Sequence, residues 1–385
     1  MQNFFSLLKR EFQLFWQNSV LRMLFIGAPL LYAILLGYVY SKGKVTDLPI
    51  LVIDYDQTEM SAKAIEMFND DEVINVAAVL YDQNEIAKIT IDKEANAVVI
   101  IPKGFQKMVF TKKYPEITTI VNTANILTAN YASTAIQICL GTLKVRIQME
   151  MLRKQGVPEK LIPSQYEPFK TTFIKKYNRS TNYMYYLWPG VLSAVLQQVM
   201  LLALALSFAS EFENGTFSQL VQKSNSIVQM MSVKIIPYLV MSFGVWLIYW
   251  FFTFYFRIPF FTNLPQLTFV AGIFILSVSF IGILVSILIP NQLKATEILM
   301  VIATPSFILS GFSWPLSQMP NWVQSVANII PLTHFLKAFR ILIIEEGTLS
   351  QVQNPIYNMI IIGIVCAILS YIALYFKSKK ALQST

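Results

Sequence analysis

Charged residues are scarce in this chain of 385 residues, since Asp, Glu, Lys and Arg together make up only 14% of it. Soluble domains carry about 25% charged residues, so this composition and a mean hydropathy of +0.52 exclude an ordinary water-soluble enzyme. The single histidine, His334, disfavours a histidine-based metal site or a catalytic triad. With only Cys139 and Cys366, no disulfide framework is expected.

The charges that are present gather in one stretch. Residues 41–183 contain 34 of the 52 charged residues, whereas the other 242 residues contain only 18. The stretch 41–183 therefore has the composition of a soluble domain, and the rest of the chain has that of a membrane protein. A helix that crosses the hydrocarbon core needs about 20 apolar residues. The uncharged runs, trimmed at Pro, Asn and Gln clusters, predict six spans near 21–40, 184–209, 235–256, 267–289, 296–313 and 357–376.

Six crossings place both termini on one side of the membrane. The short segments that flank the spans on that side carry nine Lys and Arg residues, against three on the opposite side. Because cytoplasmic loops carry the excess of basic residues, both termini, including the tail 377–385, are expected in the cytoplasm. The net charge of +8 needs no nucleic-acid partner, since a basic inner flank against anionic membrane lipid accounts for part of it.

Residues 1–20 precede the first span, 21–40, and carry apolar side chains at helical spacing: Phe4, Leu8, Phe12 and Phe15. This pattern predicts a cytoplasmic helix that lies in the membrane interface and leads into the span. The alternative is a secretory signal peptide, but no small-residue cleavage site follows Leu36.

The charged stretch 41–183 alternates short β-branched runs with helical segments. Strands are expected at 50–53, 97–101 and 116–121, and a helix at 61–68 with Ser61 as its N-cap. A long helix is expected at 125–155, because this segment contains no proline. The expected fold is therefore an α-helical integral membrane protein with six transmembrane helices and an α/β extracytoplasmic domain, 41–183, inserted between helices 1 and 2. Transmembrane helices 2–6 then occupy residues 184–376.

Nothing in the inserted domain indicates an enzyme. Asp54 and Asp56 end a predicted strand, where ligands often bind, but a solvated turn that caps the next helix is the favoured interpretation. No Gly-rich phosphate loop, metal-spaced cluster or activated nucleophile follows. The pair Lys112-Lys113 is interpreted as a solvated face rather than a binding patch.

The membrane part offers no source of energy of its own. No sequence of the form G-x-x-x-x-G-K-[S/T] occurs, so the chain cannot bind ATP through a P-loop. The predicted span interiors contain no ionisable residue, since Arg22 and Glu297 lie at span ends, which disfavours a carrier driven by a charge relay. Any energy must therefore arrive through a partner.

The cytoplasmic loop 210–234 is a candidate docking site. Gly215 can end the preceding helix in the left-handed conformation, and Thr216 can cap a short second helix. That helix would carry Phe217, Leu220 and Val221 on one side and present an apolar face to a soluble subunit. A plain polar loop is an equally good interpretation of the pattern.

Three sets of motifs carry a resemblance over essentially the whole chain. They are Glu211-x-Glu213-x-Gly215-Thr216 after span two, then Ser310-Gly-Phe312, Met319-Pro320 and Pro331-Leu-Thr333 to Phe339-Arg340 after span five, and Val52 to Asp56 with Ile101-Pro-Lys-Gly104-Phe105 in the insert. With these motifs in this order along the sequence, the chain resembles a permease subunit of the type-2 ABC exporters. It resembles the bacterial, drug-export-like subfamily that has a large external domain between spans 1 and 2.

The resemblance implies a multi-pass protein of the bacterial cytoplasmic (inner) membrane that moves a hydrophobic or amphipathic substrate out of the cytoplasm or inner leaflet. Such permeases work in pairs, with a second copy or a paralogue, and each sits on a separate ABC ATPase subunit. That subunit binds ATP and Mg, so this chain is expected to hold no cofactor, to have no catalytic or metal residue, and to be no enzyme. The external domain can contact a periplasmic adaptor protein. The residues implied in ATPase coupling are Glu211, Glu213, Gly215, Thr216 and Leu220.

The family's second and fifth spans line the substrate cavity. The matching polar residues are Ser193, Gln197, Gln198, Thr304 and Ser306, with hydrogen bonding between helices as the alternative role. The segment 314–340 is expected to re-enter the membrane, because its prolines break the backbone, and to act as an external gate. The gate candidates are Trp314, Pro315, Pro320, Trp322 and Pro331. An aromatic run is interpreted as an outer interface belt: Tyr183, Tyr185, Tyr186 and Trp188.

Two other classes of function compete with transport. A non-transporting envelope receptor or scaffold would have the same architecture, with the inserted domain as its working part. A membrane-anchored enzyme is the least favoured, because the insert lacks a reactive group of residues.

Overall fold

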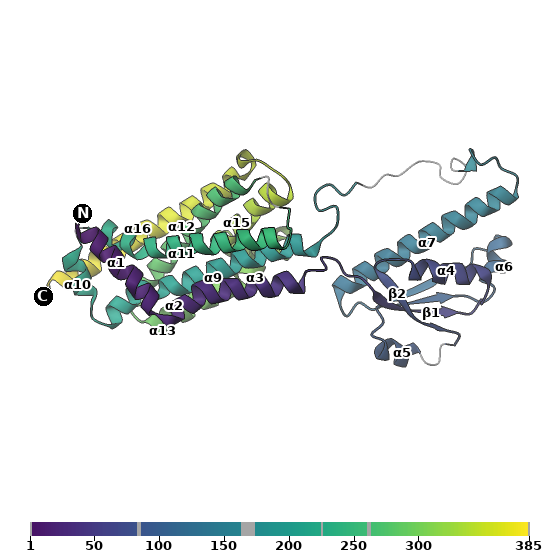
Figure 1. Cartoon of the computed structure of the whole chain (residues 1–385), viewed down its shortest axis with the longest axis horizontal. Helices are drawn as coiled ribbons and strands as arrows, with labels where there is room; N and C mark the ends of the chain where they lie inside the picture. Colours follow the sequence, from purple (N-terminus) through teal and green to yellow (C-terminus); the bar gives the residue numbers. More distant parts are fainter. Residues whose placement is uncertain (1, 83–85, 163–173, 225, 260–262, 384–385) are drawn as a thin grey trace. The chain divides into compact units, whose positions relative to one another are not determined.

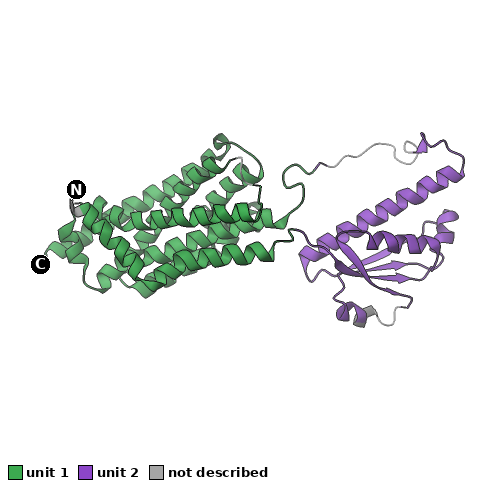
Figure 2. Cartoon of the chain, viewed as in Figure 1, with its two compact units in different colours: residues 1–43, 175–385 green, residues 44–174 purple. Residues whose placement is uncertain are grey.

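The chain divides into two compact units, residues 1–43 with 175–385 (unit 1) and residues 44–174 (unit 2), as Figure 2 shows. The computed structural model describes residues 2–82, 86–162, 174–224, 226–259 and 263–383. Parts of the predicted segments lie outside the described residues: residue 1 of the N-terminal segment 1–20, 83–85 and 163–173 of the inserted domain, residue 225 of the loop 210–234, 260–262 of the segment 184–376, and 384–385 of the tail.

Unit 1 is helical. Its elements are α1 (Gln2–Gln17), α2 (Ser19–Arg22), a π-helical turn (Met23–Gly27), α3 (Ala28–Val39), α9 (Tyr183–Glu213), α10 (Phe217–Lys223), α11 (Ile227–Tyr255), α12 (Leu264–Leu288), α13 (Gln292–Leu309), a 3-10 turn (Leu316–Gln318), α14 (Asn321–Ala327), α15 (Pro331–Phe339), a second π-helical turn (Arg340–Ile344), a second 3-10 turn (Leu349–Val352) and α16 (Gln353–Gln383). Among the described residues, six helical segments are long and apolar enough to cross a membrane, or up to seven if the bent pair Asn321–Ala327 and Pro331–Ile344 forms one span, which agrees with the six predicted spans. The third begins at Ile227, earlier than the predicted 235, so Lys234 lies inside this helix.

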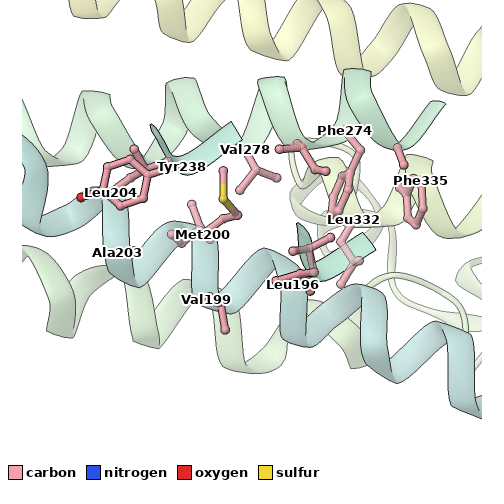
Figure 3. Close-up of a cluster of buried hydrophobic side chains, with 14 of the residues drawn as sticks. Leu196, Val199, Met200, Ala203, Leu204, Tyr238, Phe274, Val278, Leu332 and Phe335 are labelled. Carbon is pink, nitrogen blue, oxygen red and sulfur yellow. The ribbon is translucent and has the colours of Figure 1, made fainter. Parts of the chain in front are cut away.

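Helix α9 lies at the centre of unit 1. In its most apolar 18 residues, 72% are buried, against 22% in α13. Figure 3 shows part of the core, where side chains of α9 such as Met200 and Leu204 lie beside residues of α11, α12 and α15. The rings of Phe274 and Phe335 stack there with centroids 4.5 Å apart. Trp188 is also buried and donates to the carbonyl oxygen of Ala33 (3.1 Å), so the belt interpretation was wrong for this residue.

Glycine allows α9 and α12 to approach closely. A Cβ built on Gly282 of α12 would lie 2.7 Å from the Cβ of Leu204, whereas one built on Gly272 of the same helix would meet nothing within 4 Å. Apolar side chains gain little by association inside lipid, so small residues that admit close backbone packing stabilise membrane helix pairs.

The amphipathic helix α1 packs on α11 through its buried face, Leu7, Glu11 and Phe15. It ends where Asn18 caps α2, its side chain accepting hydrogen bonds from the amides of Val20 and Leu21. The predicted N-terminal helix is therefore present. A carboxylate occupies the middle of its buried face, which the apolar stripe did not predict.

Figure 1 shows α10, the start of α1 and the end of α16 at one end of unit 1, with α15 toward the opposite end. The segments Asn321–Ala327 and Pro331–Ile344 meet at an angle of 86°, as in a broken span or re-entrant loop. The bend lies within the segment 314–340, whose re-entry into the membrane stays a prediction.

Unit 2 is an α/β unit with a four-stranded sheet in the order β2-β1-β3-β4. Its elements are β1 (Leu48–Asp54), α4 (Glu59–Asn69), β2 (Ile74–Leu80), α5 (Ile86–Asp92), β3 (Ala97–Ile101), α6 (Phe105–Phe110), β4 (Thr118–Val121) and α7 (Ile126–Lys154). β1 is parallel to β2 and β3, and β4 is antiparallel to β3. The three predicted strands and both predicted helices are confirmed. The edge strand β2 was not predicted, although six of its seven residues, Ile74-Asn-Val-Ala-Ala-Val-Leu80, are apolar.

The turn after β1 is closed by its own acidic residues. Asp54, which is 4% exposed, accepts hydrogen bonds from the amide of Asp56 (3.0 Å) and from the hydroxyl of Ser61 (2.7 Å). The N-cap of α4 is Thr58 rather than the predicted Ser61, which instead completes a capping box from the third helical position. Neither aspartate caps α4, and Asp54 is buried, so the prediction of a solvated turn whose aspartates cap the next helix was wrong; Asp56 instead accepts a hydrogen bond from the amide of Gln106 in α6 (3.0 Å).

We expect Gly282→Ala to lower the thermal unfolding temperature of the detergent-solubilised chain, because the new Cβ would push α12 away from Leu204. The cost should be about 1–3 kcal/mol, as for other overpacked sites. Gly272→Ala is the matched control on the same helix and should leave the unfolding temperature unchanged or raise it. Equal losses in the two variants would contradict close packing at Gly282.

Candidate functional site: a buried charge cluster at the acidic Gly-Thr turn

The end of α9 forms a Schellman turn. Gly215 has φ +68°, and the amide of Thr216 donates to the carbonyl oxygen of Glu211 (3.0 Å) while the amide of Gly215 donates to that of Phe212 (3.4 Å). The predicted left-handed conformation of Gly215 is confirmed. Any other residue there would be strained, because a side chain disfavours this backbone region.

Helix α10 follows the turn, but its apolar face is covered by this chain. Phe217 and Leu220 are 7% and 1% exposed, and α10 packs on α16. Leu220 therefore cannot itself present an apolar face to a soluble subunit, and that expectation is corrected. Thr216 does not cap α10 through its side chain either, since its hydroxyl donates to the carboxylate of Glu211. The exposed residues at this surface are polar: Glu213, Asn214, Gln219, Gln222 and Lys223.

Beneath the turn lies a buried cluster of four charged residues from three helices. The ammonium group of Lys234 (α11) lies 2.7 Å from a carboxylate oxygen of Glu211 (α9) and 2.9 Å from one of Glu11 (α1). Arg10 (α1) contacts the same Glu211 carboxylate at 2.9 Å. Lys234, Glu211 and Glu11 are 1%, 2% and 7% exposed. Two positive and two negative charges balance, which is the condition under which charges can be buried together.

Burial raises the pKa of Glu11 above its ordinary value, and this effect outweighs the opposing attraction to Lys234. The ionised carboxylate of Glu11 is thus held in the cluster by its ammonium partner against the cost of desolvation. Lys234 links α11 to both α1 and α9, since it bonds to a carboxylate from each, whereas Arg10 links α1 to α9 directly.

A pocket of about 430 Å³ lies against the cluster. Its polar lining includes the four clustered side chains together with Ser207, Ser210, Thr216 and Gln292. Among the described residues, no group of three or more His, Cys, Asp or Glu side chains is arranged to hold a metal ion. The ion pairs of the cluster fix the positions of α1, α9 and α11 relative to one another.

Glu213 lies only two residues from Glu211 but is exposed, and it joins α9 to α13 instead. One of its carboxylate oxygens accepts hydrogen bonds from the backbone amide and from the side-chain amide of Gln292, both at 3.1 Å. Gln292 is the first residue of α13, so a carboxylate is placed at a helix N-terminus, where it is electrostatically favoured.

The five predicted cavity residues do not form one polar surface within a single chain. The side-chain amide of Gln197 donates to the hydroxyl of Ser306 (2.9 Å), and both residues are buried, which joins α9 to α13. The hydroxyl of Ser193 bonds within its own helix to Pro189 (2.7 Å). Gln198 is half-buried and Thr304 is exposed. The bond between Gln197 and Ser306 agrees with the alternative of hydrogen bonding between helices.

The motif Ser310-Gly-Phe312 meets the motif that ends in Arg340 on the surface of α9. The ring of Phe312 stacks on that of Tyr186, with centroids 4.6 Å apart and planes within 7°. A Cβ on Gly190 would lie 2.4 Å from the Phe312 ring. Arg340 lies over the same ring at 5.6 Å and donates to the carbonyl oxygen of Gly311 (3.3 Å). The motif Ser310-Gly-Phe312 and the motif that ends in Arg340 therefore pack against each other and against α9.

Among the gate candidates, Trp314 and Trp322 are 59% and 72% exposed, and Pro315 and Pro320 are exposed as well. Pro331 is buried at the start of α15, where proline is well tolerated because the first helical amide needs no partner. Four of the five gate candidates are therefore exposed in the single chain and one is buried.

A sequence model described as "ABC-2 family transporter protein" matches residues 19–372. The chain belongs to the ABC-2 transporter family. It is 24% identical over 366 residues to the probable multidrug ABC transporter permease YbhR of Escherichia coli (strain K12), covering 93% of this chain and 94% of that protein. It is 21% identical over 351 residues to the linearmycin resistance permease protein LnrN of Bacillus subtilis (strain 168), covering 83% and 86%. A third relative, the probable multidrug ABC transporter permease YbhS of E. coli (strain K12), is 26% identical over 166 residues, 43% of this chain and 44% of that one.

Membership of the ABC-2 family confirms the predicted type-2 permease and identifies a multi-pass membrane transport subunit rather than a classical enzyme. The family implies an ATPase partner and a pair of permeases. Glu211 and Glu213 belong to one of the motifs that carried the resemblance. The sequence analysis missed Arg10, Glu11 and Lys234, which cluster with Glu211, although a glutamate four residues from both Leu7 and Phe15 interrupts the apolar face of α1.

We expect Lys234→Met to destabilise the chain by about 3–5 kcal/mol, because two buried carboxylates lose their shared partner. Thermal unfolding of the solubilised chain measures this loss. Lys223→Met is the control, since Lys223 is exposed on α10. A triple variant, Glu11→Gln, Glu211→Gln and Lys234→Met, should recover part of the stability, because it leaves no buried charge unpaired.

The stability of Lys234→Met should also depend on pH. In the native chain the ammonium group of Lys234 lowers the pKa of Glu11, whereas burial raises it. Without the ammonium group only the raising effect of burial remains, so the Glu11 carboxylate binds a proton more tightly in the folded state than in the unfolded state. A raised folded pKa stabilises at low pH, and this contribution is lost as pH rises through the folded pKa. The unfolding temperature of the variant should thus increase as pH is lowered from 8 to 5, and the triple variant should not share this increase. A pH-independent Lys234→Met variant would refute the electrostatic account.

Proposed function

We propose that this chain is the membrane-spanning half of an ABC exporter, which moves a hydrophobic or amphipathic compound out of the cytoplasm or inner leaflet. A separate ATPase subunit binds ATP and Mg and supplies the energy. One observation carries this proposal: the exposed Glu213–Gly215 turn is continuous with Glu211, which is ion-paired to two other helices. A force applied to the turn therefore acts on several helices at once.

The turn is connected to both helices that the family uses for its cavity. Glu211 fixes the end of α9 to α1 and α11, and Glu213 bonds to the first residue of α13. Deeper in unit 1, Gln197 and Ser306 join α9 to α13 again. A tilt of α9 would strain or break that second bond and expose two polar groups between the helices. We propose this as the way in which closing of the ATPases changes the cavity.

The outer side of α13 gives the second permease a place to bind. Its exposed apolar residues include Leu293, Met300, Val301 and Ile308, and 74% of Val301 is exposed in the single chain. We propose that a second copy or a paralogue covers this face, with Thr304 and Gln198 directed to the shared cavity. Lipid would cover the remaining apolar surface.

The proposed orientation places α10 and both termini in the cytoplasm and unit 2 outside the membrane. The excess of Lys and Arg at the flanks of the spans supports it. Unit 2 is then available to a periplasmic adaptor, and the segment 314–340 lies at the outer end as a gate. The structure of α14 and α15, two short helices with an 86° bend, supports a re-entrant segment.

Purification with the partner ATPase and reconstitution in lipid would test coupling. Glu213→Ala should lower substrate-stimulated ATP hydrolysis by about fivefold or more, the size of a typical coupling free energy, because α9 loses its bond to α13. The control is Glu297→Ala, since Glu297 is an exposed carboxylate on α13. Equal activities of the two variants would refute the proposed role of the turn.

The orientation has an independent test. A cysteine at Gln219, which is exposed on α10, should react with a membrane-impermeant maleimide only after the membrane is opened. Reaction in intact cells would place the turn outside and exclude an ATPase partner there. A chain that never copurifies with an ATPase would instead favour a non-transporting receptor or scaffold.

A further inference from the structure

Unit 2 contains a pocket of about 650 Å³ that the transport mechanism does not use. It lies between α6, the segment 111–117 and the second half of α7. In Figure 1, α7 extends past the strands of the sheet, and α6 lies near its far end. The pocket volume falls within the range of about 300–1,000 Å³ that is typical of small-molecule sites.

The pocket exists because the apolar stripe of α7 is longer than the sheet that it covers. The first half of the helix packs on the strands through small residues, including Ala132 and Ala135. The stripe then continues at helical spacing through Leu140, Leu143 and Ile147, which line the pocket. Across from them lie further apolar residues: Phe105, Val109, Pro115 and Ile117.

The charged residues that line the pocket are all basic, among the residues that the structure describes. Lys112 and Lys144 line it, whereas none of the described residues that line it is acidic. Lys154 lies over the ring of Phe110 at 5.2 Å and adds a third cation where the ends of α6 and α7 meet. Both lining lysines are exposed, so their ammonium groups can reach a ligand at the mouth while their methylene chains cover apolar surface.

We propose that this pocket binds a single-chain amphiphile with an anionic head group, such as a medium-chain carboxylate. The alkyl chain would lie along Leu140, Leu143 and Ile147, and the head group would pair with Lys112 and Lys144. Charge complementarity selects this occupant over an apolar peptide or a neutral lipid, neither of which would pair with the two cations. The site belongs to unit 2 and does not depend on transport by unit 1.

Photolabelling of the full chain tests the proposal. The chain is reconstituted in nanodiscs of zwitterionic phosphatidylcholine and exposed to a diazirine derivative of dodecanoic acid. Mass spectrometry should locate the label on residues 140–155 or 105–117, and unlabelled dodecanoate should compete better than dodecanol or dodecylamine. Label found only elsewhere, or equal competition by the three compounds, would overturn the proposal. The proposal would also be overturned if no labelling occurred, and a protein segment would then be the expected occupant of the pocket.

Variants separate the head-group pairing from general charge. Lys112→Ala with Lys144→Ala should weaken labelling by about tenfold, as expected when two exposed ion pairs are lost. Lys103→Ala with Lys113→Ala removes the same charge from exposed positions that do not line the pocket, and it should label as the parent chain does. Ile147→Trp should block labelling by filling the apolar part. Unchanged unfolding temperatures show that each variant is folded, and equal labelling in the two lysine pairs would refute the proposed site.

Discussion

The ammonium group of Lys234 holds three helices together at the end of unit 1 that carries α10. It is buried inside a helix that is otherwise apolar, and burying an unpaired charge would cost several kcal/mol. The two carboxylates that neutralise it come from α1 and α9. Neither of these helices can move away from α11 unless Lys234 loses a partner, so one charge determines where three helices lie.

This constraint gives a physical meaning to the acidic Gly-Thr motif. Two residues along a helix point in roughly opposite directions, so Glu211 faces the interior while Glu213 faces solvent and bonds to α13. Gly215 then reverses the chain at a φ that other residues avoid, and Thr216 returns a hydroxyl to Glu211. The motif therefore combines an inward anchor, an outward contact and a sharp turn in six residues.

Much of the fold followed from patterns along the chain. The spans were predicted from uncharged apolar runs, α1 and three of the four strands from the local pattern of apolar residues, and α7 from the absence of proline. The edge strand β2 was missed although it is rich in apolar residues, and Ser61 was assigned the cap that belongs to Thr58 because both hydroxyls suit a helix start. The apolar side of α10 was predicted correctly, but the pattern could not show that α16 would cover it.

By itself, the sequence determined which segments can enter a membrane, which stretch forms an α/β unit, and where α9 ends, because composition, periodicity and glycine conformation are local properties. Only the tertiary structure decided that Lys234 faces Glu11 and Glu211, that Gln197 bonds to Ser306, and that Lys112 lies beside the stripe of α7. The physical reason is that a buried charge or an amide needs a partner, and packing brings that partner from a helix distant in the sequence.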